Sequence, residues 1–211
     1  MKQLAITADD FGLHRNLDRG IVEVCEKGVV THVSLVANGA NIKEACRFLL
    51  QHPETTAGIH LNLTDGNPLS NPDSIRPLLN KTGNFLGLHR EVVVAYLSRP
   101  SLLKVIEAEY RAQVERLLGL GIRLWQLNCH GHLHAIPHLF RLVTRLASDY
   151  QIPFVRVSEE WPSAGLFLRS LKQASKMSLL AFGFRASKRI VKKENRWKKN
   201  YCFGMFDSGA L

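Results

Sequence analysis

Two adjacent carboxylates, Asp9 and Asp10, follow the first apolar segment of the chain, within the run TADDFG at 7–12. Their like charges repel, so the pair is costly beside a core unless a cation offsets it. Because successive side chains of an extended segment point in opposite directions, one carboxylate can bind a metal ion while its neighbour has another task. A helix N-cap is the alternative interpretation, but it accounts for one aspartate and not for two.

A histidine cluster provides further candidate ligands. Three alternating histidines, His130, His132 and His134, follow an apolar segment directly, in the run NCHGHLH at 128–134. If this run is extended, the three rings share one face, and if it is helical, His130 and His134 pair at i, i+4. Either arrangement can bring imidazoles around one ion. A surface histidine patch without a ligand is the alternative.

His60 is a further candidate, within the apolar run GIHLNLT at 58–64. By itself, a histidine in such a strand is more often a hydrogen-bonded core residue than a ligand. Together with the other two motifs, it completes a mixed set of carboxylate and imidazole ligands, which suits zinc, manganese or cobalt. A metal with an open position activates water, and a free carboxylate can take the proton of that water. The residues therefore point to amide or ester hydrolysis.

The elements that must position these residues alternate between short apolar strands and helical segments. We expect strands at 4–7, 33–37, 57–63, 123–129 and 154–157. We expect helices at 17–27, 42–51, 102–118 and 137–150, with a long polar connection at 64–90. This alternation predicts a parallel α/β sheet or barrel. The polar motifs would then follow strands at their carboxyl ends, where α/β proteins place their sites.

Composition limits the other functions. The 211 residues, 45% of them hydrophobic, suit one globular domain with a core. The first residues do not show the pattern of a secretory signal, and no apolar run approaches the roughly 20 residues that span a bilayer, so we expect a cytoplasmic protein. The four cysteines form no C-x-x-C pair and are expected to be reduced. The chain shows none of the G-x-S-x-G, P-loop or G-x-G-x-x-G motifs.

Charge is concentrated near one end of the chain. The net charge is +10, and the segment 185–199 holds eight Lys or Arg and one Glu. A solvated helix face is the favoured interpretation of this segment. Contact with an anionic membrane surface is the alternative, which would make the protein membrane-associated. Nucleic acid is not an expected partner, because no nucleic-acid-binding motif accompanies the charge.

The motifs together resemble the YdjC-like carbohydrate deacetylases. The matching runs are TADDFG at 7–12, GIHLNLT at 58–64 and N-x-H-x-H-x-H-x-x-P at 128–137, with less specific agreement at 108–117 and 155–157. The basic helix and the run FGMFDSG at 203–209 more closely resemble the hopanoid-biosynthesis-associated HpnK branch. The resemblance extends over nearly the whole chain, as a single domain at 1–211.

The resemblance implies a distorted (β/α) barrel of the glycoside hydrolase/deacetylase type, a magnesium or zinc ion, and removal of N-acetyl groups from an amino sugar. It assigns Asp10, His60 and His130 to the metal, Asp9 to the general base, and His134 to the pocket without a defined role. We expect His132 and His134 to bind the substrate. The substrate would be an N-acetylated sugar or a glycolipid.

One departure from the family pattern concerns the end of the chain. Family members continue into a late strand with a His-Pro motif, whereas this sequence stops at Leu211 without one. We therefore expect the C-terminal strands of the barrel to be missing, which leaves barrel closure and the general acid open. A non-catalytic sugar- or lipid-binding protein and a metal phosphoesterase are alternative functions. Exposed apolar edges of an incomplete barrel would favour a homodimer.

Overall fold

A computed structural model describes residues 4–87, 89–157, 175, 178 and 180–186. The chain forms two compact units, Met1–Gly131 and His132–Leu211. Most of the basic segment at 185–199 lies outside the described residues, and so does the run at 203–209. Contact with an anionic membrane surface therefore stays a prediction. None of the described helices has the length and apolar character needed to cross a bilayer.

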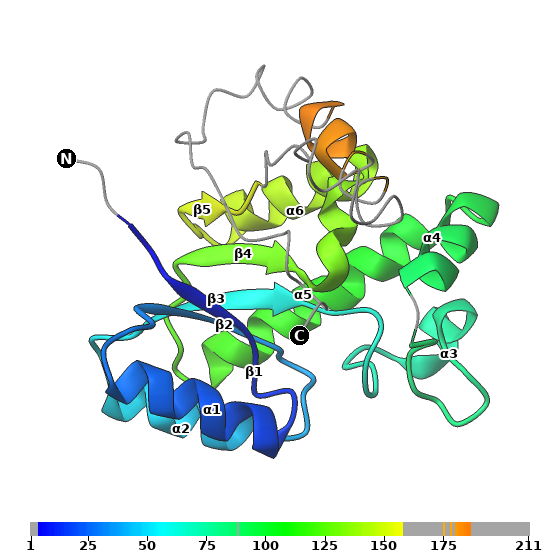
Figure 1. The fold of residues 1–211 in the computed structure, drawn as a ribbon. Coiled ribbons are helices and arrows are strands. Elements are labelled where there is room, and N and C mark those ends of the chain that lie inside the picture. Colours follow the sequence, from blue (N-terminus) through cyan, green and yellow to red (C-terminus); the bar gives the residue numbers. More distant parts are fainter. Residues whose placement is uncertain (1–3, 88, 158–174, 176–177, 179, 187–211) are drawn as a thin grey trace. The chain divides into compact units, whose positions relative to one another are not determined.

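The first unit is built on parallel strands. The strands β1 (Thr7–Phe11), β2 (His32–Leu35), β3 (Thr56–Leu61) and β4 (Gln126–Cys129) pair in chain order (Figure 1). Because all four run in the same direction, their carboxyl ends gather at one edge of the sheet. The predicted parallel α/β class is confirmed, and closure into a barrel stays a prediction.

Helices connect these strands, as parallel pairing requires. The helix α1 (Arg15–Glu26) follows β1, and α2 (Ile42–Gln51) follows β2. The buried side chains of α2 recur at helical spacing and are Ile42, Ala45, Cys46 and Leu49. The long helix α5 (Leu102–Gly119) precedes β4 and carries Glu109, which is fully buried.

The first strand differs from its expected position. The segment 4–7 was predicted as the strand, with both aspartates after it, but β1 comprises Thr7–Phe11 and contains Asp9 and Asp10. That prediction was wrong because pairing with β2 resumes at Phe11 after an irregularity. Asp10 lies in this irregularity with a φ of 65°.

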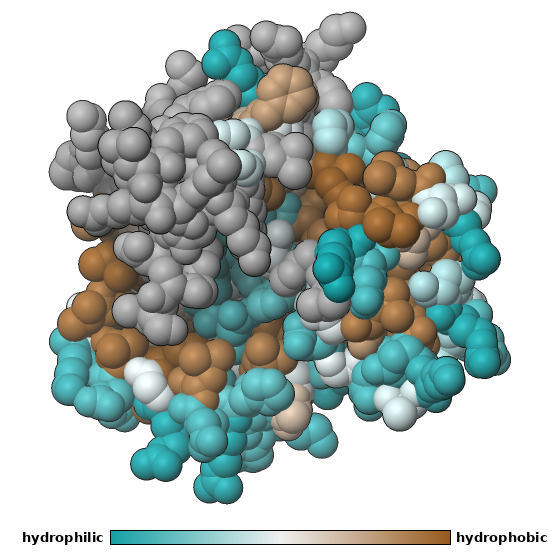
Figure 2. Space-filling model, turned by 45° about the vertical axis from the view of Figure 1, so that its right-hand side comes forward, coloured by the Kyte–Doolittle hydropathy of each residue, from teal (hydrophilic) through white to brown (hydrophobic). Residues whose placement is uncertain are grey.

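The connection at 64–90 is also more structured than expected. It contains the short helix α3 (Pro72–Ile75) and the 3-10 helix η1 (Arg76–Leu78), and the helix α4 (His89–Ser98) begins near its end. Val94 and Leu97 of α4 are 62% and 68% exposed. Figure 2 shows hydrophobic patches among the hydrophilic residues of one face. Such surfaces are where self-association occurs, and the homodimer stays a prediction.

The second unit contains most of the 3-10 helix η2 (His130–Ala135), α6 (Pro137–Asp149) and the short strand β5 (Phe154–Val155). The helix α6 begins at Pro137. Proline suits the first turn of a helix, where a backbone N–H would find no partner within the helix. Within this unit, the Phe184 ring lies edge-on to the rings of His134 and Phe140, at centroid distances of 5.0 and 6.4 Å.

Candidate metal centre

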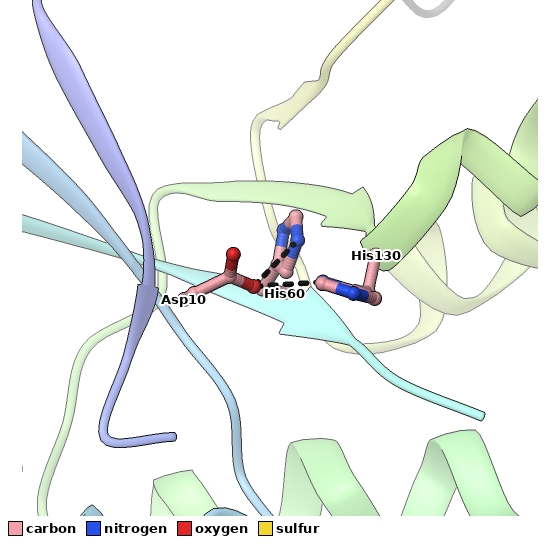
Figure 3. Close-up of side chains that lie close together, drawn as sticks. All are labelled: Asp10, His60 and His130. Carbon is pink, nitrogen blue, oxygen red and sulfur yellow. Dashed lines mark hydrogen bonds and ion pairs between the residues drawn. The ribbon is translucent and has the colours of Figure 1, made fainter. Parts of the chain in front are cut away.

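Three predicted ligands meet at the carboxyl ends of the strands. Asp10 comes from β1, His60 from β3, and His130 follows β4 directly (Figure 3). Asp10 Oδ1 lies 2.7 Å from His130 Nδ1 and 3.3 Å from His60 Nε2. Each residue of this Asp–His–His cluster offers one ligand atom, and these atoms all lie within 4.8 Å of one another. One cation can therefore contact all three.

The backbone of β1 turns Asp10 into this position. Its φ of 65° lies in the left-handed region, which aspartate adopts more readily than most residues with a side chain. The strand irregularity between Ala8 and Phe11 has the effect of a bulge, which redirects a side chain at the end of a strand. Bulges are frequent next to active sites, so the backbone supports a functional task for Asp10.

His60 is held as a neutral imidazole. Its Nδ1 lies 2.8 Å from Asn128 Oδ1, and Asn128 Nδ2 donates to Asp9 Oδ1 at 3.3 Å. Because the amide oxygen only accepts, Nδ1 of His60 carries the proton and donates it, and Nε2 directs its lone pair toward Asp10. Burial lowers the pKa of His60, which favours the neutral ring that binds metals.

His130 has a different electrostatic environment. Burial acts to lower its pKa, but the hydrogen bond to Asp10 and the charges of Asp10 and Asp65 outweigh burial and raise the pKa. For Asp10, burial acts to raise the pKa, and the hydrogen bond from His130 and the charge of His60 lower it. A hydrogen bond joins His130 Nδ1 and Asp10 Oδ1, and a divalent cation between these two atoms would replace its proton. The donor set fits such an ion.

The other two histidines of the cluster at 130–134 are placed differently. The segment is a 3-10 helix with positive φ at Gly131 and His132, and so neither of the two predicted geometries, extended or α-helical, is present. His134 is fully buried, and its Nε2 donates to the carbonyl oxygen of Arg156 at 3.0 Å. His132 is half-buried, and the centroid of its ring lies 6.2 Å from the centroid of the His134 ring. Roles of His132 and His134 in substrate binding stay predictions.

No task was assigned to Asn128 or Asp65 from the sequence. Asn128 contacts His60 of the Asp–His–His cluster, and Asp65 contacts His130 of the same cluster. Asn128 is the register partner of His60 in the β3–β4 pair, so a correct strand alignment would have found it. Asp65 Oδ2 lies 3.6 Å from His130 Nε2. Asp65 belongs to the connection after β3, where no local pattern marks it.

The fold and the cluster together define an α/β protein with a candidate divalent-metal centre at the carboxyl edge of its sheet. The chain belongs to the YdjC-like protein family, whose family model matches residues 3–211. The predicted family is thereby confirmed, and the HpnK-type branch stays a prediction.

Curated relatives agree with this family. The chain is 34% identical over 151 residues to a carbohydrate deacetylase of Brevibacillus brevis, covering 72% of this chain and 58% of that protein. It is 36% identical over 148 residues to a carbohydrate deacetylase of Geobacillus stearothermophilus, covering 70% of this chain and 57% of that protein. The chain thus spans less than two thirds of the length of these relatives.

A solved structure from Enterococcus faecalis V583, of a protein provisionally assigned to cellobiose-phosphate cleavage, has a similar fold. The TM-score is 0.62 at 20% identity, with coverage of 97% of this chain and 83% of that chain. At this identity the likeness concerns the fold alone.

Proposed function

We propose that this chain carries the metal-dependent centre of a carbohydrate deacetylase, which hydrolyses the acetamide group of an N-acetylated amino sugar. The observation that carries the proposal is the convergence of Asp10, His60 and His130 ligand atoms within 4.8 Å. Family membership and the relatives named carbohydrate deacetylase support the choice of reaction.

Asp10, His60 and His130 would hold the ion, magnesium or zinc. A divalent ion supplies Lewis-acid chemistry, since it polarises the amide carbonyl and lowers the pKa of water. Asn128 keeps the lone pair of His60 Nε2 directed toward Asp10, because its amide oxygen accepts the hydrogen bond that Nδ1–H of His60 donates. The side chains supply the mixed oxygen and nitrogen donors that both ions accept.

Asp9 is the proposed general base. Its carboxylate is about one third exposed, so water can reach it, and Oδ1 accepts the Asn128 amide at 3.3 Å. Asp9 precedes Asp10 in the chain and its Oδ1 lies 4.0 Å from His60 Nδ1, and its carboxylate would take the proton of the attacking water. Asn128 links this base to His60, because its Oδ1 accepts from His60 Nδ1 and its Nδ2 donates to Asp9 Oδ1.

Finer assignments accompany this proposal. A sugar carried on a lipid and the HpnK-type branch follow from the sequence resemblance and stay predictions. A cytoplasmic location was expected from the first residues and the apolar runs, and membrane association from the basic segment at 185–199, and both stay predictions too. A non-catalytic sugar-binding protein on the same fold would bind the N-acetyl sugar without releasing acetate, and the assay below distinguishes the two.

The test measures acetate release from N-acetylglucosamine oligomers by the metal-free protein, with and without added Mg²⁺ or Zn²⁺. Loss of release with chelator and its return with metal are expected. Asp9→Asn should slow release about 10²–10⁴-fold, the usual contribution of a positioned base. The matched control is Asp73→Asn in α3, an exposed aspartate outside the cluster. The scheme would be contradicted if the rate of acetate release were the same with and without chelator, or the same in Asp9→Asn as in the wild type. Phosphate release from a phosphomonoester without acetate release would favour a phosphoesterase.

A further inference from the structure

We infer that Asp65 is a positioning residue of the metal centre, whose carboxylate accepts the Nε2 proton of His130 and so strengthens the binding of a divalent cation. This inference rests on the proposed function, because it concerns the ion that the cluster would hold. Neither the motifs nor the family resemblance drew attention to Asp65.

The two nitrogens of His130 face two different carboxylates. Nδ1 lies 2.7 Å from Asp10 Oδ1, inside the cluster, and Nε2 lies 3.6 Å from Asp65 Oδ2. A ring that binds a cation through Nδ1 must carry its proton on Nε2, and that proton then needs an acceptor. A carboxylate behind a metal-bound histidine supplies this acceptor, fixes the tautomer and increases the basicity of the ligand nitrogen.

The separation of 3.6 Å is an ion-pair distance and is longer than a hydrogen bond. The Asp65 side chain is 41% exposed, so it has room to rotate toward the ring. The Asp65 carboxylate attracts the Nε2–H group of His130 over this distance, and that N–H points its proton toward Asp65 Oδ2. We therefore expect the contact to shorten when a cation occupies the Nδ1 side of His130.

The main chain of Asp65 is anchored by the side-chain amides of Asn62 and Asn38, and its carboxylate accepts from the hydroxyl of Thr64. Its N–H donates to Asn62 Oδ1 at 3.1 Å, and its carbonyl oxygen accepts from Asn62 Nδ2 and Asn38 Nδ2, both at 2.8 Å. The Thr64 hydroxyl donates to Asp65 Oδ2 at 2.7 Å. Asn62 and Thr64 are 1% exposed. The main chain of Asp65 is thus fixed on both sides, and one oxygen of its carboxylate accepts from a hydroxyl that water does not reach.

This anchor extends to α5. Gln113 is fully buried, and its side-chain amide pairs with the main chain of Asn62 through two hydrogen bonds of 2.9 and 2.7 Å. The same amide donates to Glu109 Oε1 at 2.8 Å. A purely local role, in which Asp65 only closes the turn after β3, would explain the bonds to Thr64 and Asn62. It would not explain why the carboxylate faces His130.

The test measures the dissociation constant of Zn²⁺ on the full chain, by competition with a chromophoric chelator. Asp65→Asn keeps the shape and an oxygen for the Thr64 hydroxyl but loses the charge. We expect it to bind Zn²⁺ about 10- to 100-fold more weakly than the wild type, as for other partners of metal-bound histidines. Asp65→Glu should recover most of the affinity, and the control Asp73→Asn should bind as the wild type does. The melting temperature of metal-free Asp65→Asn should be unchanged.

Each outcome bears on the inference. An Asp65→Asn affinity within twofold of the wild type would overturn the role of Asp65 and leave the metal centre standing. A weaker affinity with a lowered melting temperature and no recovery in Asp65→Glu would assign Asp65 to the turn alone and overturn the inference too. A wild-type chain that does not bind Zn²⁺ or Mg²⁺ would overturn both this inference and the proposed function.

Discussion

Removing the carboxylate of Glu109 should destabilise the protein through the loop that carries Asp65. Glu109 is fully buried on α5. It accepts hydrogen bonds from the Leu69 N–H at 3.0 Å, from the Ser70 N–H at 2.7 Å and from Gln113 Nε2 at 2.8 Å. These bonds attach the loop after β3 to the helix. Glu109→Ala would leave all three donors without this acceptor.

The magnitude follows from the exposure of the donors. Hydrogen bonds to a charged group contribute roughly 1.5–3 kcal/mol each, and burying the carboxylate offsets part of the sum. Leu69 and Ser70 are half-buried, so water can replace the acceptor for them, but it cannot reach fully buried Gln113. We expect Glu109→Ala to lower the free energy of unfolding by about 3 kcal/mol. Glu109→Gln should cost less, since it keeps one accepting oxygen.

The assay is urea unfolding of the metal-free protein, followed by circular dichroism at constant m-value. Glu107→Ala is the matched control on the same helix. Glu107 forms an i, i+4 ion pair with Arg111 at 2.9 Å, and its loss should cost only about 0.5 kcal/mol. If Glu109→Ala and Glu107→Ala cost the same, or if Glu109→Ala costs under about 1 kcal/mol, the loop is not held by this carboxylate and the reasoning fails.

Three further predictions concern the cluster, a thiol and a glycine. The pKa of His130 is raised, and a proton on His130 competes with the cation. The affinity for Zn²⁺ should therefore fall as the pH is lowered, and the fall should begin above the ordinary histidine pKa of about 6.5. Equal affinities at about pH 6 and pH 8.5 would contradict this prediction. Burial raises the pKa of Cys46 to about 11, so iodoacetamide at pH 8 should label it on the order of 100-fold more slowly in the native than in the unfolded protein, as measured by peptide mass spectrometry. Gly39→Ala would place a Cβ 2.1 Å from the Gly12 carbonyl oxygen and should lower the free energy of unfolding in urea by about 1–3 kcal/mol. The control is Gly119→Ala, which has open space around it and should not destabilise the protein.

Local patterns in the sequence were sufficient for the class of fold and for the helices α1, α2, α5 and α6, but not for α3 and α4. The predicted helix at 42–51 coincides with α2 (Ile42–Gln51), and the helix predicted at 102–118 differs from α5 by one residue. Helices are readable in this way because their apolar periodicity lies within one segment. The types of the candidate ligands were also apparent, since acidic pairs and alternating histidines are local features.

The arrangement of the cluster depended on contacts between distant segments. Asp10 was expected after the first strand, but pairing with β2 places it within β1 in a left-handed conformation. His60 by itself resembled a core histidine, and only the β3–β4 register puts it opposite Asn128, 68 residues further on, which directs its Nε2 toward Asp10. His134 looks like an equal member of the histidine run, yet it is buried with a carbonyl partner.

The sequence by itself therefore determined which chemical groups this protein has available and roughly which elements carry them. The tertiary structure decided which groups meet: Asp10, His60 and His130 at one point, with Asp65 behind His130. The physical reason is that hydropathy and turn preferences act over a few neighbouring residues. Strand register, and the direction in which each imidazole nitrogen points, are set by hydrogen bonds between residues far apart in the chain.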